Sequence, residues 1–260
     1  MITATDPAPT EATKRAEIEL HSRLVEEYEK RHRPAAGRAY HDWWNGRLLD
    51  RLPRSAGTRV LDLSCGTGVL LSALGARYSG AVGIDLSPDM LAATEGSAPR
   101  LVRGDSEVLP FAAGSFDAAV CRGALHHLPR LEPCIEELGR VVRKGGRVVV
   151  SEPSHDALHL RLPRWAWRKW SARFGEHHRA LPSRWLVARF EAAGFALVQK
   201  ERFGYLGFPL CGMLDHLPVL ARAKRGDRWA RALIRADDAI GKVPVLRRES
   251  WGLTLVLDRL

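Results

Sequence analysis

The sequence predicts an α/β fold built on a doubly wound, mostly parallel seven-stranded sheet, with the last strand antiparallel and with helical lid insertions. Short apolar runs alternate with amphipathic helical stretches between residues 59 and 151, which is typical of a parallel sheet with helices on both faces. A glycine-rich turn directly follows the first apolar run. Open sheets of this class bind ligands beyond the carboxyl ends of their strands, so this turn indicates where a site should lie.

Seven segments have the short, apolar character of buried strands. They are residues 59–63, 81–85, 101–103, 116–121, 147–151, 195–202 and 251–257. The fifth follows a turn at Gly145 and Gly146.

Helical periodicity occupies most of the intervals between these strands. The predicted helices are residues 11–30, a stretch that follows Pro34 and stops at Pro53, then 68–78, 87–94, 131–142, 183–193 and 210–240. Ser87 and Pro88 support the start of the helix over 87–94, because serine caps a helix N-terminus and proline favours the first turn.

The composition fits one large domain. With 260 residues and 45% apolar content, the chain can bury a substantial core. No run approaches the roughly 18 consecutive apolar residues of a membrane-spanning helix. The four cysteines form no Cys-x-x-Cys pair, which argues against the usual zinc and redox motifs, and reduced thiols fit a cytoplasmic protein.

The net charge of +10 is confined to one part of the chain. Residues 1–152 carry 20 basic and 20 acidic side chains, whereas residues 153–260 carry 20 and 10. The C-terminal part is therefore expected to meet an acidic ligand or an anionic surface. A solvated basic face is the alternative.

The segment 60–68, VLDLSCGTG, places an apolar strand directly before Gly66 and Gly68 and then a helix. Both glycines let backbone approach a ligand where a side chain would obstruct it. A dinucleotide fold uses the same arrangement, but its third glycine would fall at Leu71, whose bulk opposes close packing.

Two aspartates end the next two predicted strands. Asp85 is placed to accept both hydroxyls of a ribose, and Asp105 or its backbone could receive the exocyclic amine of adenine. Either one alone is more often a turn residue or a helix cap. Together, at successive strand ends, they favour a nucleoside site.

At this point the chain resembles the class I S-adenosylmethionine-dependent methyltransferases, with a domain similar to methyltransferase type 11. The resemblance is carried by VLDLSCGTG, by GIDLS at 83–87, by LPFAAGSFDAAVCRGALHHL at 109–128 and by KGGRVVVSEP at 144–153, in that order. It covers residues 48–153 and implies S-adenosylmethionine as the cofactor.

The resemblance also implies a set of cofactor-binding residues. Asp62 and the loop Ser64, Cys65, Gly66 and Gly68 would hold the methionine end, Asp85 the ribose, and Leu86, Met90, Asp105 and Ser106 the adenine, with Arg122 contacting the cofactor through its backbone. Ser64 departs from the family, which more often has glycine there. Tyr40 is expected to close over the cofactor, and core packing is its alternative.

The domain boundaries follow from these assignments. They are a flexible tail at 1–12, N-terminal helices covering the cofactor at 13–54, a Rossmann-like cofactor-binding core at 55–153, a helical lid for the acceptor at 154–182 and 204–247, and the remainder of the core at 183–203 and 248–260.

His126 and His127 follow the fourth strand, so they are expected beside the transferred methyl group. A histidine can remove the proton of a hydroxyl acceptor near neutral pH, which makes this pair the catalytic candidates. Capping or packing against the following helix is the alternative. Glu152, His155 and His159 suggest a metal cluster, but histidines on a lid helix are more often surface residues, so no metal site is expected.

The segment 158–174 interleaves three tryptophans with arginines and a lysine. This composition suits peripheral contact with a membrane, an apolar pocket with anion-binding arginines, or stacking on nucleic acid. No RNA-binding module is recognisable, so a hydrophobic small acceptor, with or without an anionic group, is favoured over nucleic acid. Lid tryptophans packed on the core are the remaining alternative.

Three functions follow from the sequence. The first is methylation of a hydrophobic small molecule, such as a secondary metabolite, a quinone precursor or a lipid, with oxygen slightly favoured because of the histidine pair. The second is a methyltransferase of RNA or protein that docks through the basic lid. The third is a non-catalytic protein that binds the cofactor and contacts a partner.

Overall fold

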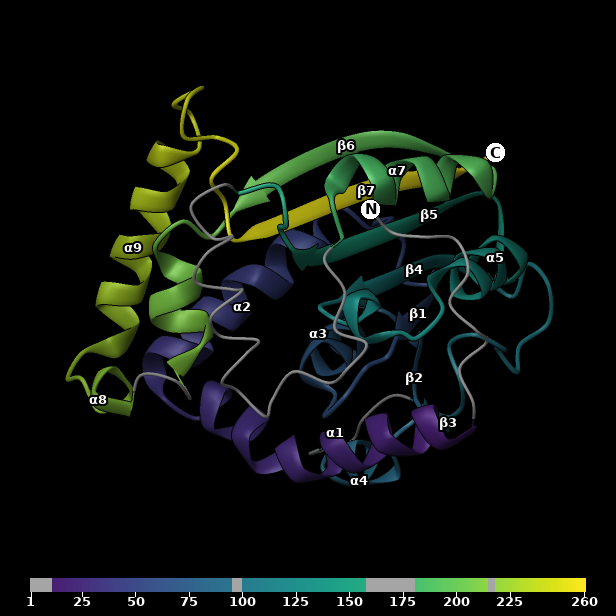
Figure 1. The fold of residues 1–260 in the computed structure, drawn as a ribbon, viewed down its shortest axis with the longest axis horizontal. Coiled ribbons are helices and arrows are strands. Elements are labelled where there is room, and N and C mark those ends of the chain that lie inside the picture. The colour runs from purple at the N-terminus through teal and green to yellow at the C-terminus, as the bar shows by residue number, and fades with distance from the viewer. Residues whose placement is uncertain (1–10, 95–99, 158–180, 215–217) are drawn as a thin grey trace.

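The computed structural model describes residues 11–94, 100–157, 181–214 and 218–260. They form a seven-stranded sheet of order β3-β2-β1-β4-β5-β7-β6, in which only β7 runs antiparallel to its neighbours (Figure 1). The strands are β1 Arg59–Leu63, β2 Gly80–Asp85, β3 Arg100–Arg103, β4 Phe116–Arg122, β5 Val142–Pro153, β6 Phe195–Phe203 and β7 Gly252–Arg259. The predicted fold class is confirmed.

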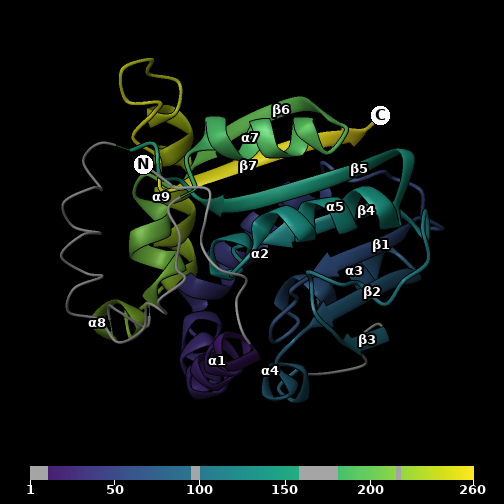
Figure 2. The same ribbon diagram turned by 45° about the vertical axis from the view of Figure 1, so that its right-hand side comes forward.

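Helices cover both faces of this sheet, as Figure 2 shows. They are α1 Glu11–His32, α2 Ala35–Leu49, α3 Val69–Arg77, α4 Pro88–Ala92, α5 Leu131–Val141, α7 Ser183–Ala192, α8 Pro218–Ala221 and α9 Gly226–Ile240, with a 3-10 turn η1 at Leu125–His127 and a π-helical turn η2 at Phe208–Gly212. The Ser87 hydroxyl caps α4 by accepting the Met90 N–H, with Pro88 in the first turn as predicted.

The helical stretch predicted over 210–240 is not a single helix. The structure divides this stretch into the end of η2, the short α8 and the longer α9. Pro218 cannot continue a preceding helix because its ring removes a backbone donor and clashes with the preceding turn. Arg225, just before α9, has the left-handed backbone conformation, with φ 56°.

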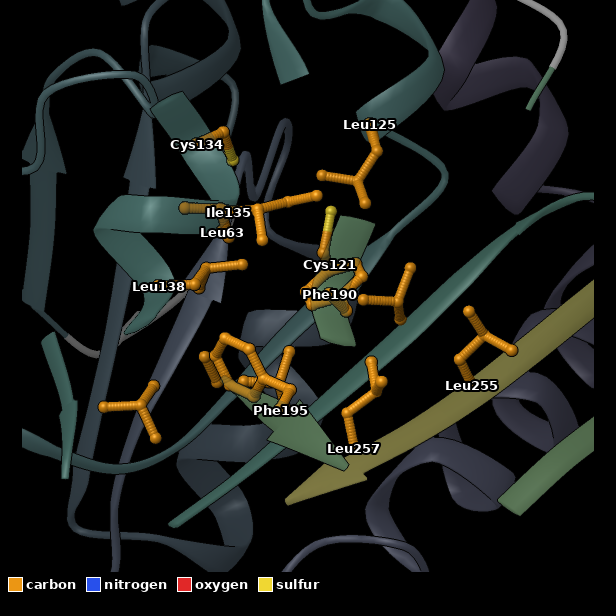
Figure 3. Close-up of a cluster of buried hydrophobic side chains, with 14 of the residues drawn as sticks. Leu63, Cys121, Leu125, Cys134, Ile135, Leu138, Phe190, Phe195, Leu255 and Leu257 are labelled. Atoms are coloured by element: carbon orange, nitrogen blue, oxygen red, sulfur yellow. The ribbon is translucent and has the colours of Figure 1, made fainter. Parts of the chain in front are cut away.

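Two hydrophobic cores lie on opposite faces of the sheet. Side chains of α5 and α7 pack on one face with the residues labelled in Figure 3, among them Leu63, Cys121 and Phe190. Side chains of α2, α3 and α9 pack on the other face around Tyr40 and Val120. Alternate residues of the central strands point into the two cores, which explains why those strands are apolar throughout.

The N-terminal helix α1 lies beside α4 at the edge of the sheet that carries β2 and β3 (Figures 1 and 2). It therefore crosses the region where the parallel strands end. No helix in the described part of the chain is both long enough and apolar enough to cross a bilayer.

Candidate functional site

The loop after β1 has a backbone conformation that favours glycine. Ser64 and Gly66 both have φ 55° and Gly68 has φ 77°, in the left-handed region where side chains are disfavoured. A Cβ at Gly68 would lie 2.5 Å from the Cγ2 atom of Thr94, whereas one at Gly66 would meet no atom within 4 Å. Gly66 therefore leaves free space for a ligand, and Gly68 sets the shape of the loop.

Ser64 keeps this left-handed conformation although it is not glycine. A non-glycine residue there costs of the order of 1 kcal/mol or more, so the surrounding structure must hold it. Its hydroxyl lies 3.0 Å from the Ser106 hydroxyl, which ties the loop to the segment after β3.

Asp85 ends β2 and organises the loop from the neighbouring strand. One carboxylate oxygen accepts the Gly66 N–H at 2.8 Å and the other accepts the Ser87 N–H at 2.9 Å. A carboxylate oxygen can accept more than one hydrogen bond, so both oxygens retain capacity for a ligand hydroxyl. Asp85 therefore lies beside the glycine loop, as predicted.

Asp62 is a buried carboxylate at the end of β1. Only 2% of the residue is exposed, and its Oδ2 atom has no hydrogen-bond partner among the described residues. Burial raises the pKa of Asp62 from 3.8 to about 8, while Arg122 opposes the rise and Asp85 adds to it. A buried carboxylate of this kind is suited to meet a cation.

Arg122 extends from the end of β4 into the same region. Its guanidinium donates toward Nδ1 of His41 at 2.7 Å, also donates to the Asn45 side chain, and lies 4.5 Å from the ring centroid of Trp44. Burial lowers the pKa of Arg122 to about 10, which still leaves the group charged at neutral pH. The arginine thus connects α2 to the site, a side-chain role that the sequence did not predict.

Asp105, at the end of β3, is paired with a lysine of α1. Lys14 forms an ion pair with Asp105 and a second one, at 3.1 Å, with Glu107. Glu107 is buried and also pairs with Arg130 at 3.0 Å. These contacts hold α1 against the core. The contact of Asp105 with adenine stays a prediction.

A cavity lies among these residues at the carboxyl ends of β1, β2 and β4. Most of the predicted cofactor residues line it, together with one of the two predicted histidines: Asp62, Ser64, Cys65, Gly66, Asp85, Leu86, Met90, Asp105, Ser106, Arg122 and His127. Of the predicted cofactor residues, Gly68 and Tyr40 are not on this lining.

One wall of the cavity comes from α1, and these residues were missed in the sequence. They are Lys14, Glu17, Ile18, His21, Tyr28 and His32. Apart from the adjacent Glu17 and Ile18, neighbours in this set are three, four or seven residues apart, which places them on one helix face. The available signal was that four of the six, Lys14, Glu17, His21 and His32, have acidic or basic side chains.

Tyr40 does not line the cavity, which corrects its predicted place over the cofactor. It is fully buried in an aromatic cluster, with its ring centroid 5.2 Å from that of Trp43 and 6.4 Å from that of Phe208. A Cβ at Gly207 or at Gly212 would lie within about 3 Å of the Tyr40 ring. The close approach of these glycines packs the ring into the core beneath α9.

The two adjacent histidines occupy different environments. His126 is 6% exposed and its Nδ1 lies 2.6 Å from a carboxylate oxygen of Glu152. His127 lines the cavity and meets the ring of His21 edge-on at a centroid distance of 5.1 Å. Of the predicted pair, only His127 is on the cavity wall. The segment 158–174 and His159 lie outside the described residues.

Comparison with known proteins identifies the domain. A family model described as a methyltransferase domain matches residues 61–150. A demethylmenaquinone methyltransferase of Corynebacterium efficiens is 37% identical over 109 residues, which cover 42% of this chain and 47% of that protein. Residues 61–150 form a methyltransferase domain. The chain spans about half the length of this relative.

Solved structures share the fold of this chain across most of its length. A Thermotoga maritima protein described as a possible histamine N-methyltransferase has a TM-score of 0.64 at 16% identity, covering 93% of this chain and 99% of its own. A geranyl diphosphate C-methyltransferase from Streptomyces coelicolor, solved with S-adenosyl-L-homocysteine, has a TM-score of 0.57 at 16% identity, covering 84% and 78%.

The cofactor of the methyltransferase domain is S-adenosylmethionine, and the cavity fits it in two respects. The buried Oδ2 atom of Asp62 can pair with the ammonium group of the methionine end, which would compensate its burial. The free space beside Gly66 lets the ligand reach the loop backbone, while Asp85 stands at the neighbouring strand end for the ribose. The residues therefore fit a cationic nucleoside.

Proposed function

We propose that this protein transfers the methyl group of S-adenosylmethionine to a hydrophobic small molecule, with a hydroxylated quinone precursor as the favoured acceptor class. One observation carries the proposal: His127 stands on the wall of the same cavity that gathers the nucleoside-binding positions. The cavity wall also has an apolar part, formed by Ile18, Val69, Leu70, Leu86, Met90, Ala124, Leu128 and Pro129.

The protein's share of the reaction is orientation and the exclusion of water. S-adenosylmethionine supplies an already activated methyl group, so the enzyme needs no strong electrophile of its own. Helix α1 covers the cavity from outside and is held to the core by the pairs of Lys14 with Asp105 and Glu107. A covered cavity keeps the acceptor in line and keeps water away from it.

His127 is the candidate proton acceptor for a hydroxyl group. Its imidazole would take the proton that leaves the acceptor oxygen as the new oxygen–methyl bond forms. His126 would act indirectly, because its pairing with Glu152 fixes the turn that presents His127. Oxygen is therefore favoured over nitrogen and carbon as the methylated atom.

The relatives support the choice of acceptor class. The Corynebacterium efficiens relative and one from Thermus thermophilus, 38% identical over 117 residues, are both demethylmenaquinone methyltransferases. Each match covers 42% of this chain, so more than half of the chain, which includes part of what could recognise an acceptor, has no counterpart in it. The quinone class of acceptor is thus carried over from relatives that match only part of this chain.

The test is direct methylation by the full-length chain. Incubation with methyl-labelled S-adenosylmethionine and a panel of hydroxylated quinols, simple phenols, lipids, RNA and protein extract should give a product about 14 Da heavier, a methyl replacing a hydrogen, among the quinols or phenols. Label found only in RNA or protein would replace the proposed acceptor with a macromolecule. Cofactor binding without any transfer would favour a non-catalytic binding protein.

A further inference from the structure

A cluster of metal-ligating side chains lies at the rim of the cavity, outside the set used above for the cofactor. Glu17, His21 and His127 each offer a ligand atom, and these atoms all lie within 4.8 Å of one another. We propose that they bind a divalent transition-metal ion of the zinc type and so join α1 to the turn after β4. The sequence does not predict this site, because the ligands come from segments far apart in the chain.

The donor set indicates the class of metal. Two imidazole nitrogens and one carboxylate oxygen form a common three-ligand set for Zn²⁺, in which a fourth position stays open. Ca²⁺ and Mg²⁺ prefer oxygen ligands throughout, so they suit this cluster poorly.

His21 is oriented for coordination by a backbone contact. Its Nδ1 lies 2.8 Å from the carbonyl oxygen of Glu17, so the N–H belongs on Nδ1 and the lone pair on Nε2. Ligating histidines usually donate their second ring nitrogen in this way, which fixes the tautomer before the metal arrives. Glu17 and His21 are also four residues apart and therefore share one face of α1.

Small side-chain movements would complete the site. A tetrahedral zinc ion holds its ligand atoms about 3.3 Å apart, as follows from bond lengths near 2.0 to 2.1 Å. The side chains of Glu17 and His21 are 12% and 21% exposed, so they lie at the rim and not inside a packed core. Rotation about side-chain bonds can close the remaining distance without moving the helix.

The lysine nearest to this cluster on α1 is engaged in ion pairs with the core. Lys14, one turn before Glu17, is directed to Asp105 and Glu107 by two ion pairs. A bound metal would add a bridge from α1 to the core beside these pairs, across the same cavity. It should therefore slow cofactor exchange. The metal would also occupy a nitrogen of His127 and should therefore inhibit methyl transfer. Only this inhibition rests on the proposed function.

The test is metal binding by the full-length chain without cofactor or acceptor. Metal-free protein is titrated with Zn²⁺ by calorimetry and with Co²⁺ by visible absorption, which reports ligand geometry. We expect one equivalent to bind, and we expect Glu17→Gln and His21→Asn each to weaken binding about tenfold or more. Glu19→Gln is the matched control, because Glu19 lies on the exposed face of the same helix, with a side chain 69% exposed.

Two results would overturn the site: no binding of one equivalent by the wild-type chain, or unchanged affinity in both ligand variants. Thermal melts and cofactor titrations without metal show whether each variant is folded. A variant that does not fold is replaced by His127→Asn, which removes the ligand on the core side. Because no methyl acceptor is present, failure here is separate from failure of the proposed reaction.

Discussion

Glu152 and His126 form a buried pair in which Oε2 of the carboxylate lies 2.6 Å from Nδ1 of the imidazole. The other oxygen of Glu152 accepts the backbone N–H groups of Ala124 and Leu125, at 3.0 and 2.9 Å. One carboxylate at the end of β5 therefore holds three groups of the turn that follows β4. This turn places His126 beneath the cavity and His127 on its wall.

Replacing Glu152 with alanine should destabilise the fold. The change leaves a buried imidazole and two backbone N–H groups without this acceptor, and each buried donor left unsatisfied costs about 1 to 3 kcal/mol. Urea unfolding followed by circular dichroism measures the loss. Glu136→Ala, an exposed change on α5, should have almost no effect. Equal stability of the two variants would show that the carboxylate does not hold the turn.

The sheet could be predicted well from the sequence because each strand is marked by a short pattern of consecutive residues. Each central strand is buried on both faces, so it is a continuous apolar run that periodicity alone can locate. The stretch after residue 203 was predicted less well. Its apolar residues have helical spacing, but Pro218 and the left-handed Arg225 break the helix, and spacing does not register such breaks.

The core side of the site was predicted residue by residue, whereas the covering side was predicted only as the N-terminal helices of residues 13–54, without the residues that line the cavity. Gly66, Asp62 and Asp85 stand at fixed offsets from predicted strand ends, and parallel strands bring such ends together. The position of α1 over the cavity depends on tertiary contacts such as the ion pair of Lys14 with Asp105. Nothing in the local sequence of α1 specifies that partner.

Asp85→Ala should weaken cofactor binding by about 1 to 3 kcal/mol, measured by calorimetry with S-adenosylmethionine. The carboxylate acts twice in our proposal, since it accepts the Gly66 N–H and stands where a ribose would lie. Asp89→Ala is the control, because that residue also lies near the start of α4 but does not line the cavity. Unchanged affinity in Asp85→Ala would remove the ribose assignment.

His127→Gln should lower turnover by about a hundredfold and leave the Kd of the cofactor within a factor of about two, as expected for loss of a general base. Glutamine keeps hydrogen-bonding capacity but cannot take a proton. The measurement is a label-transfer assay on the best acceptor from the panel, with kcat and KM determined separately. A rise in KM with kcat unchanged would instead make His127 a binding residue.

Cofactor binding should release a proton through Asp62. Burial raises the pKa of this carboxyl to about 8, so most of it is protonated in the free protein at pH 7. Pairing with the ammonium group of S-adenosylmethionine favours the ionised form, and the proton then leaves. Calorimetry in buffers of different ionisation enthalpy counts the proton. We expect nearly one for the wild-type chain and none for Asp62→Asn.

The same carboxyl should make the free protein less stable as the pH rises. Its pKa is higher in the folded state than the ordinary 3.8, so between about pH 4 and pH 8 the unfolded state binds fewer protons than the folded state. The free energy of unfolding therefore falls across this window and levels off above it. Asp62→Asn has no such group to ionise, so its Tm should equal that of the wild-type chain near pH 4 and exceed it increasingly toward pH 8. If the Tm of the two proteins changed equally with pH, the raised pKa of Asp62 would be contradicted. The argument that this carboxylate pairs with the cationic cofactor would then lose its basis.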